Sequence, residues 1–127
     1  MDFITLIIGL PGSGKTYLAN QMKREDEGLI DDIKSVDQLP ESGSMIITDP
    51  HLCVSSTLDN ALAFLKRRYP YHLFEIVFFE NDLEKALANV ERRDDGRKVT
   101  SFATRLAAIY NPPKDCIKIY SPNKEIQ

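Results

Sequence analysis

The sequence predicts an α/β fold in which helices cover both faces of a parallel sheet, and two observations lead to that prediction. Short apolar runs rich in β-branched residues alternate along the chain with stretches of helical periodicity. These runs are apolar at successive positions, which is typical of parallel strands covered on both faces. The chain has 127 residues, of which 43% are hydrophobic, and this fits a single domain, residues 1–127, around one core.

Strands and helices are expected to alternate in the order of the chain. The predicted strands are residues 3–8, 29–30, 45–48, 71–79 and 116–120. The predicted helices are residues 15–24, 56–68, 83–93 and 100–110. Ser56 and Asp59 have the spacing of a capping box at the second helix, and Asn81 is expected to cap the third. The resulting fold is a three-layer α/β/α sandwich with right-handed crossovers.

Composition excludes several classes of protein. No run of about 18 apolar residues exists, so no membrane span is expected. The apolar run at residues 3–8 is too short for a secretory leader. Cys53 and Cys116 are too few for a disulfide framework, and we expect buried, unreactive thiols in a reducing, cytoplasmic setting.

The charge distribution argues against a generally basic, nucleic-acid-binding surface. The net charge is −3, with four basic and ten acidic side chains in residues 1–65 and twelve basic and nine acidic in residues 66–127. The basic run at residues 66–68 is expected to be a solvated helix end rather than a nucleic-acid strip.

A glycine-rich motif follows the first strand. Residues 9–16 read Gly-Leu-Pro-Gly-Ser-Gly-Lys-Thr and match GxxxxGK[ST] in full. Glycines let main-chain N–H groups surround a triphosphate, Lys15 can bridge its β- and γ-phosphates, and Thr16 can ligate Mg²⁺. We therefore expect ATP and Mg²⁺ to bind here. The nucleotide-binding residues would be Gly9, Pro11, Gly12, Ser13, Gly14, Lys15, Thr16 and Tyr17.

Carboxylates follow the second and third predicted strands, where they can reach the crevice at the carboxyl edge of a parallel sheet. Asp31 or Asp32 can take a proton from an acceptor hydroxyl, and Lys34 falls within reach of an acceptor phosphate; both aspartates can instead cap a turn. Asp49 can hold a Mg²⁺-bound water, orient Lys34, or form an Asp-Pro turn. His51 can line the acceptor side or be a surface histidine.

A cationic segment ends the third helix. Arg92 and Arg93 precede the break Asp94-Asp95-Gly96, which allows a short lid, about residues 92–99, carrying Arg97 and Lys98. Guanidinium groups on a lid can close over the γ-phosphate, although a solvated helix end explains the same charges. Because Val90 is apolar and inward, Lys85, Asn89 and Arg92 are expected on the outer face of this helix.

These elements together resemble the kinase domain of phage-type polynucleotide 5′-hydroxyl kinases over nearly the whole chain. Residues 7–16 are similar to the opening of that family, and residues 31–34 to its Asp-Asp-x-Arg element. Residues 45–52 are similar to its third strand with the Asp-x-Asn-Leu ending, and residues 83–99 to its lid helix and following turn. The sequence departs from the family where His51 replaces the asparagine, and in the short segment between the second and third strands.

The resemblance assigns a role to each matching position. It implies ATP and Mg²⁺ on Lys15 and Thr16, Asp31 as general base, Lys34 in place of an acceptor-binding arginine, Asp49 as its partner and Arg92 as the lid arginine. Ala88 stands where the first lid arginine of the family is expected. We therefore expect a P-loop NTPase fold with a five-stranded parallel sheet in the order 2-3-1-4-5.

The expected function is an ATP-dependent kinase that phosphorylates a hydroxyl of a nucleic-acid or nucleotide acceptor. The acceptor would be a polynucleotide 5′-hydroxyl or a 5-hydroxymethyl pyrimidine in DNA, which needs an accessible base. Two alternatives stay open: a kinase of small nucleosides or sugars, and a nucleotide-binding regulatory module with little turnover.

Overall fold

Four parallel strands form one sheet in the order β2-β3-β1-β4. The computed structural model describes residues 2–23, 27–30, 39–93 and 99–119, and at residues 92–93 it describes the main chain alone. The strands are β1 (Phe3–Ile8), β2 (Gly28–Ile30), β3 (Met45–Thr48) and β4 (Leu73–Phe78). This order is the one expected for the first four strands, and it places β1 in the interior of the sheet between β3 and β4.

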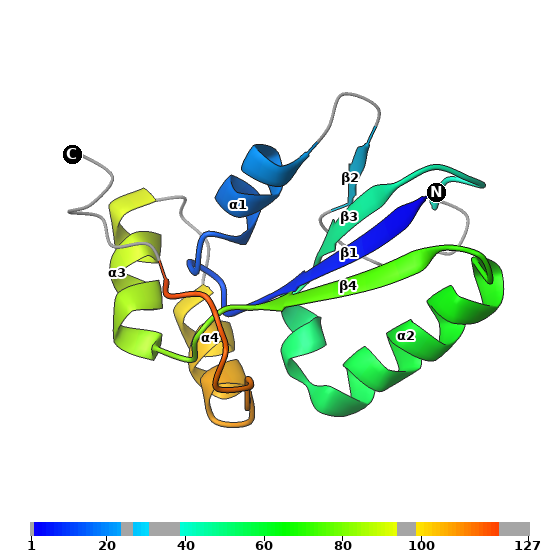
Figure 1. Cartoon of the computed structure of the whole chain (residues 1–127). Coiled ribbons are helices and arrows are strands. Elements are labelled where there is room, and N and C mark those ends of the chain that lie inside the picture. Colours follow the sequence, from blue (N-terminus) through cyan, green and yellow to red (C-terminus); the bar gives the residue numbers. More distant parts are fainter. Residues whose placement is uncertain (1, 24–26, 31–38, 94–98, 120–127) are drawn as a thin grey trace.

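Helices lie on both faces of the sheet and at one end of it. They are α1 (Lys15–Met22), the 3-10 helix η2 (Pro50–Cys53), α2 (Ser55–Arg68), α3 (Leu83–Arg93) and α4 (Val99–Ala107). Figure 1 shows α1 and α2 on opposite faces, with α3 and α4 beyond the carboxyl ends of β1 and β4. None of the helices within the described ranges is long and apolar enough to cross a bilayer.

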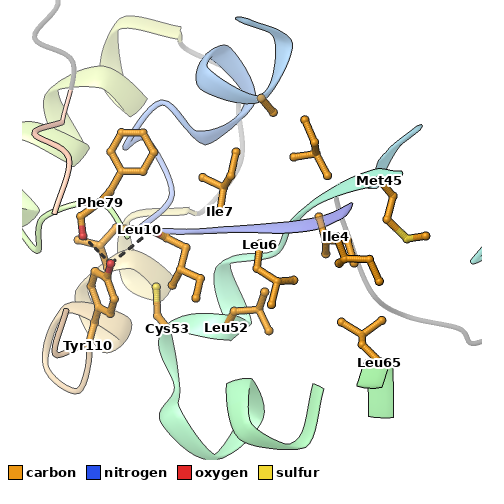
Figure 2. Packing of buried hydrophobic residues seen from close by; sticks show 14 of the residues in the cluster. Ile4, Leu6, Ile7, Leu10, Met45, Leu52, Cys53, Leu65, Phe79 and Tyr110 are labelled. Carbon is orange, nitrogen blue, oxygen red and sulfur yellow. Dashed lines mark hydrogen bonds between the residues drawn. The ribbon is translucent and has the colours of Figure 1, made fainter. Parts of the chain in front are cut away.

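The core is built from the alternating side chains of β1. Ile4 and Leu6 point toward Leu52 and Leu65, while Ile7 points to the opposite face (Figure 2). Each of these five side chains is at most 2% exposed. Because a strand turns successive residues to opposite faces, one apolar run supplies both hydrophobic layers.

The fifth predicted strand is reduced to a single contact. Ile117 forms an isolated parallel bridge with Phe79, through hydrogen bonds of 2.8 Å from the Ile117 N–H to the Phe78 carbonyl and from the Glu80 N–H to the Ile117 carbonyl. Residues 120–127 lie outside the described residues. The described sheet therefore has four strands, and the five-stranded sheet stays a prediction; the isolated bridge at Ile117 is parallel.

The predicted capping box of α2 is wrong. The helix begins at Ser55, one residue early, with Val54 in the capping position and no side-chain cap. The reason is the preceding turn η2, which leads directly into α2: the Val54 N–H bonds the His51 carbonyl at 3.1 Å, and the Val54 carbonyl accepts from Leu58 at 3.0 Å. Ser56 and Asp59 therefore lie inside the helix.

The predicted cap of α3 is displaced by one residue. Asp82 Oδ1 accepts a hydrogen bond from the Lys85 N–H at 3.2 Å, which caps the helix. Asn81 instead donates from Nδ2 to the carbonyls of Ala107 and Tyr110, both at 2.8 Å. Asn81 thus joins the start of α3 to the end of α4.

Candidate functional site

The glycine-rich loop (residues 9–14) connects the end of β1 to the start of α1. The Ser13 N–H donates to the Leu10 carbonyl at 3.0 Å, which closes the turn. Gly12 and Gly14 have φ angles of 90° and 101°, in the left-handed region that favours glycine. The motif residues are therefore the ones that this backbone path requires.

Lys15 folds back onto the loop that precedes it. Its Nζ donates to the carbonyls of Gly9 and Leu10, both at 2.9 Å, and the residue is 9% exposed. A nearly buried ammonium is stable only with polar compensation, which these two carbonyls supply in part. The loop consequently holds a fixed positive charge at its centre.

Helix α1 begins without a side-chain cap. Gly14 occupies the capping position, and the first turn contains no acidic residue. The positive end of the helix dipole therefore lies beside the Lys15 ammonium, an arrangement typical of anion sites at helix N-termini. Thr16 and Tyr17, in the first turn, are exposed and accessible from solvent.

Ser13 has a buried hydroxyl inside the loop. The residue is 0% exposed, and its Oγ has no hydrogen-bond partner among the residues described. The hydroxyl packs against Gly9, where an added Cβ would lie only 2.6 Å from Oγ. Buried hydroxyls are nearly always paired in proteins, so this one is a donor that fits an oxygen-rich ligand of the loop.

Helix α3 packs directly onto the loop. A Cβ at Gly12 would lie 2.2 Å from the Ala86 carbonyl oxygen and 2.8 Å from Val90 Cγ2. Asn89 Nδ2 donates to the Gly12 carbonyl at 2.8 Å and is half-buried. The prediction that Asn89 lies on the outer face is therefore wrong. The signal was present in the spacing, because Asn89 follows the inward Ala86 by three residues.

The ends of β1 and β4 are joined beneath the loop by a tyrosine that the sequence analysis did not single out. Tyr110 is buried, and its hydroxyl donates to the carbonyls of Phe79 and, at 3.3 Å, of Ile8 (Figure 2). Burial raises the pKa of Tyr110, so the hydroxyl stays protonated and remains a donor. The segment after α4 is thereby fixed to the strand ends that carry the loop.

Cys53 is buried beside the Gly9 main chain. Burial raises the pKa of Cys53 to about 12, a shift that the nearby Lys15 charge opposes and Asp49 reinforces, while a hydrogen bond with the Gly9 main chain lowers it. The expectation of a buried, unreactive thiol is confirmed for Cys53. Cys116 is only partly buried.

Asp49 and His51 form a pair at the end of β3. Asp49 Oδ1 accepts from the His51 main-chain N–H and lies 2.9 Å from His51 Nδ1 as well. The Asp49 side chain is 7% exposed and that of His51 59%. The His51 ring packs against Phe102 of α4, with centroids 5.1 Å apart. Of the three uses foreseen for Asp49, the structure shows the Asp-Pro turn, with Asp49 capping η2.

Several candidates cannot be compared with the structure. Asp31, Asp32, Lys34, Arg97 and Lys98 lie outside the described residues, and so do the side chains of Arg92 and Arg93. The main chain of Arg92 and Arg93 forms the last turn of α3, the helix that packs on the loop. Within the described residues, no three His, Cys, Asp or Glu side chains gather closely enough to hold a metal ion.

The basic run at the end of α2 is exposed, as expected, and part of it also contacts its own domain. Arg68 donates to the Tyr69 hydroxyl and to the Leu39 carbonyl, both at 3.1 Å. The Lys66 ammonium lies 5.9 Å from the centre of the Phe74 ring. These contacts agree with a helix end that packs on its own domain.

No family model and no solved structure matches this chain. The chain is 28% identical, over 104 residues covering 75% of each sequence, to the uncharacterized protein R277 of Acanthamoeba polyphaga mimivirus. That relative is itself uncharacterized, so the similarity indicates no function.

Proposed function

We propose that the glycine-rich loop is the phosphate-binding loop of a P-loop NTPase fold, and that the protein is an ATP-dependent kinase acting on a hydroxyl. The observation that carries the proposal is the Lys15 ammonium, held over the loop at the uncapped start of α1. A fixed cation and a helix N-terminus at one point form a site for a polyphosphate.

The loop residues suit ATP with Mg²⁺. Lys15 would lie against the β- and γ-phosphates, and the buried Ser13 hydroxyl would donate to a phosphate oxygen. Thr16, exposed in the first turn of α1, would ligate Mg²⁺, which neutralises charge on the transferred group. Asp49 would act from the second coordination shell, because its Oδ1 already accepts from His51.

The position of α3 supports a kinase over a simple nucleotide-binding module. This helix contacts the loop at Gly12 and ends with Arg92 and Arg93. Cations on an element that packs against the phosphate site are what transfer of a γ-phosphoryl group requires, because negative charge is spread over that group in the transition state. Arg97 would follow on the lid.

The acceptor is proposed to be a hydroxyl of a nucleic acid or nucleotide. This part rests on the resemblance of residues 31–34 and 45–52 to acceptor-binding elements of polynucleotide kinases. A kinase of small nucleosides or sugars is the alternative within the same chemistry.

A transfer screen tests the proposal. The full chain is incubated with γ-labelled ATP and Mg²⁺, and with a 5′-hydroxyl oligonucleotide, hydroxymethylated duplex DNA or free nucleosides. Label in an oligonucleotide or DNA product supports the proposal, and label in a nucleoside selects the alternative. Tight ATP binding without acceptor-stimulated ADP release would instead identify a regulatory nucleotide-binding module.

A further inference from the structure

We propose that His51 is the base that accepts the proton of the acceptor hydroxyl, through its Nε2 atom. The inference rests on the proposed kinase function and names a catalytic residue for it. It is built on the Asp49–His51 pair, which is a feature of the described geometry and does not depend on residues 31–34.

The pair fixes which ring nitrogen carries the proton. An ionised carboxylate only accepts hydrogen bonds, so His51 Nδ1, 2.9 Å from Asp49 Oδ1, must be the donor. The neutral ring then carries its lone pair on Nε2. Because the same Asp49 oxygen also accepts from the His51 main-chain N–H, the carboxylate is held in place from two directions.

The ring is positioned yet accessible. The Phe102 ring packs against it from α4, while 59% of the His51 side chain is exposed. No hydrogen bond involves Nε2 within the part of the chain that is described. A fixed, accessible lone pair is the property that a general base needs, whereas a histidine that serves only the fold can have Nε2 bonded within the fold.

His72, the second histidine of the chain, shows that contrast. Its Nε2 lies 2.9 Å from the Gly43 carbonyl oxygen, and its side chain is 10% exposed. The Tyr69 ring packs against it at 4.8 Å. His72 is therefore tied into the fold through the nitrogen that His51 leaves accessible, which makes it a matched control.

The location of His51 agrees with the task. Asp49 directly follows β3, and β3 pairs in parallel with β1, whose end leads into the glycine-rich loop. Ile7 is paired with Thr48, so the residues that follow these two strands leave the same edge of the sheet. An acceptor bound at this edge meets the γ-phosphate from one side and the imidazole from the other.

The step balances in atoms and electrons. The acceptor oxygen forms a bond to the γ-phosphorus as its proton passes to His51 Nε2. The bond from the γ-phosphorus to the bridging oxygen breaks, and its electron pair leaves with ADP. The imidazolium, stabilised by the Asp49 carboxylate, then returns the proton to water.

Two variants test the inference in the full-length protein. His51→Asn keeps a donor for Asp49 and removes Nε2, and His72→Gln keeps a donor for Gly43. Transfer from γ-labelled ATP to a 5′-hydroxyl oligonucleotide and to hydroxymethylated duplex DNA is measured by steady-state kinetics. We expect His51→Asn to lower kcat about 10²–10⁴-fold, with KM for ATP unchanged. His72→Gln should retain the wild-type kcat.

A third variant examines the supporting charge. Asp49→Asn keeps an oxygen acceptor and so the turn, but it removes the negative charge that stabilises the imidazolium. It should lower kcat, because the imidazolium formed in the transfer step then lacks the carboxylate that stabilises it. The ring nitrogens of His51 are assigned by ¹⁵N NMR, and the expected neutral form carries the proton on Nδ1.

Each outcome decides the matter. Wild-type transfer that survives in His51→Asn overturns the inference and leaves the kinase proposal standing; a loss in Asp31→Asn alone would then assign the base to Asp31. A neutral ring protonated on Nε2 also overturns the inference. Failure of the wild type to transfer to any acceptor, free nucleosides included, overturns both.

Discussion

The neighbouring strands β1 and β3 end at the same edge of the sheet. The helices that follow them, α1 and η2, differ in how their N-termini are capped. After β3, Asp49 caps η2 with its carboxylate, and the same oxygen holds the His51 ring. After β1, the chain makes a glycine-rich turn and enters α1 with no side-chain cap, and Lys15 places an ammonium there. One helix start is satisfied by a carboxylate of the protein, and the other is positively charged.

This difference in capping indicates which of the two helix N-termini can bind an anionic ligand. At η2, an anion would have to displace Asp49, which is buried and hydrogen-bonded. At α1, the helix dipole and the Lys15 ammonium would both stabilise a bound anion. The following predictions test this contrast, beginning with the largest effect.

Removing the positive charge should abolish function at the α1 side. Lys15→Ala should lower phosphoryl transfer at least about 10²–10³-fold, the usual cost of losing one group that stabilises transition-state charge. Lys23→Ala, at the exposed end of the same helix, is the control and should transfer normally. Steady-state kinetics with labelled ATP makes the measurement. Equal activity of the two variants would show that the loop does not bind the transferred phosphate.

Glycine-to-alanine substitutions at two positions should separate the contributions of backbone conformation and of packing to stability. Gly12 and Gly43 both have positive φ, but a Cβ at Gly12 would meet Ala86 and Val90, whereas one at Gly43 would meet nothing within 4 Å. Gly43→Ala should lose about 1 kcal/mol of unfolding free energy for the backbone alone. Gly12→Ala should lose about 1–3 kcal/mol more, from overpacking. Urea unfolding measures both. Identical losses would mean that α3 does not hold the loop in solution.

The buried Cys53 thiol should make the stability of the fold decrease at high pH. The unfolded chain loses the Cys53 proton near pH 9, whereas the fold keeps it to about pH 12. Between these values the unfolded state binds fewer protons, so stability falls as pH rises, by at most about 1.4 kcal/mol per pH unit from this group. Cys53→Ala should flatten the decline and Cys116→Ala should not, in urea unfolding from pH 9 to 11. An unchanged slope in Cys53→Ala would contradict burial of the thiol.

The smallest effect concerns the bond between α3 and the loop. Asn89→Ala should lose about 1 kcal/mol, because it leaves the Gly12 carbonyl without its side-chain donor. Glu91→Ala, on the exposed side of the helix, should be neutral. Calorimetric ATP titration of both variants sharpens the comparison: weaker ATP binding in Asn89→Ala alone links α3 to the phosphate site.

The sequence predicted the central part of the fold well because the decisive signals there are local. The apolar run of β1, the glycines of the loop and the periodicity of α3 each lie within a few residues, and β1, β3 and the order of the first four strands are confirmed. The last strand was less predictable, because among residues 116–119, which the structure describes, Ile117 alone forms a bridge to the sheet.

The site was predicted in its residue types more than in its contacts. Position along the chain does not reveal that Asn89 reaches the Gly12 carbonyl, or that Tyr110 reaches the carbonyls of Phe79 and Ile8. These are tertiary hydrogen bonds across 31 to 102 residues of chain. Tertiary structure also determines that Asp82 and not Asn81 caps α3, because the Asn81 side chain donates its hydrogen bonds to carbonyls at and after the end of α4.

The contacts of Gly12 bear on how the protein is made. The motif at residues 9–16 is synthesised well before Ala86, Asn89, Val90 and Tyr110, which form its surroundings. A nascent chain stalled before residue 80 carries the whole motif without the helix that supports it. Competence to bind nucleotide should therefore arise late in translation, when α3 emerges and docks.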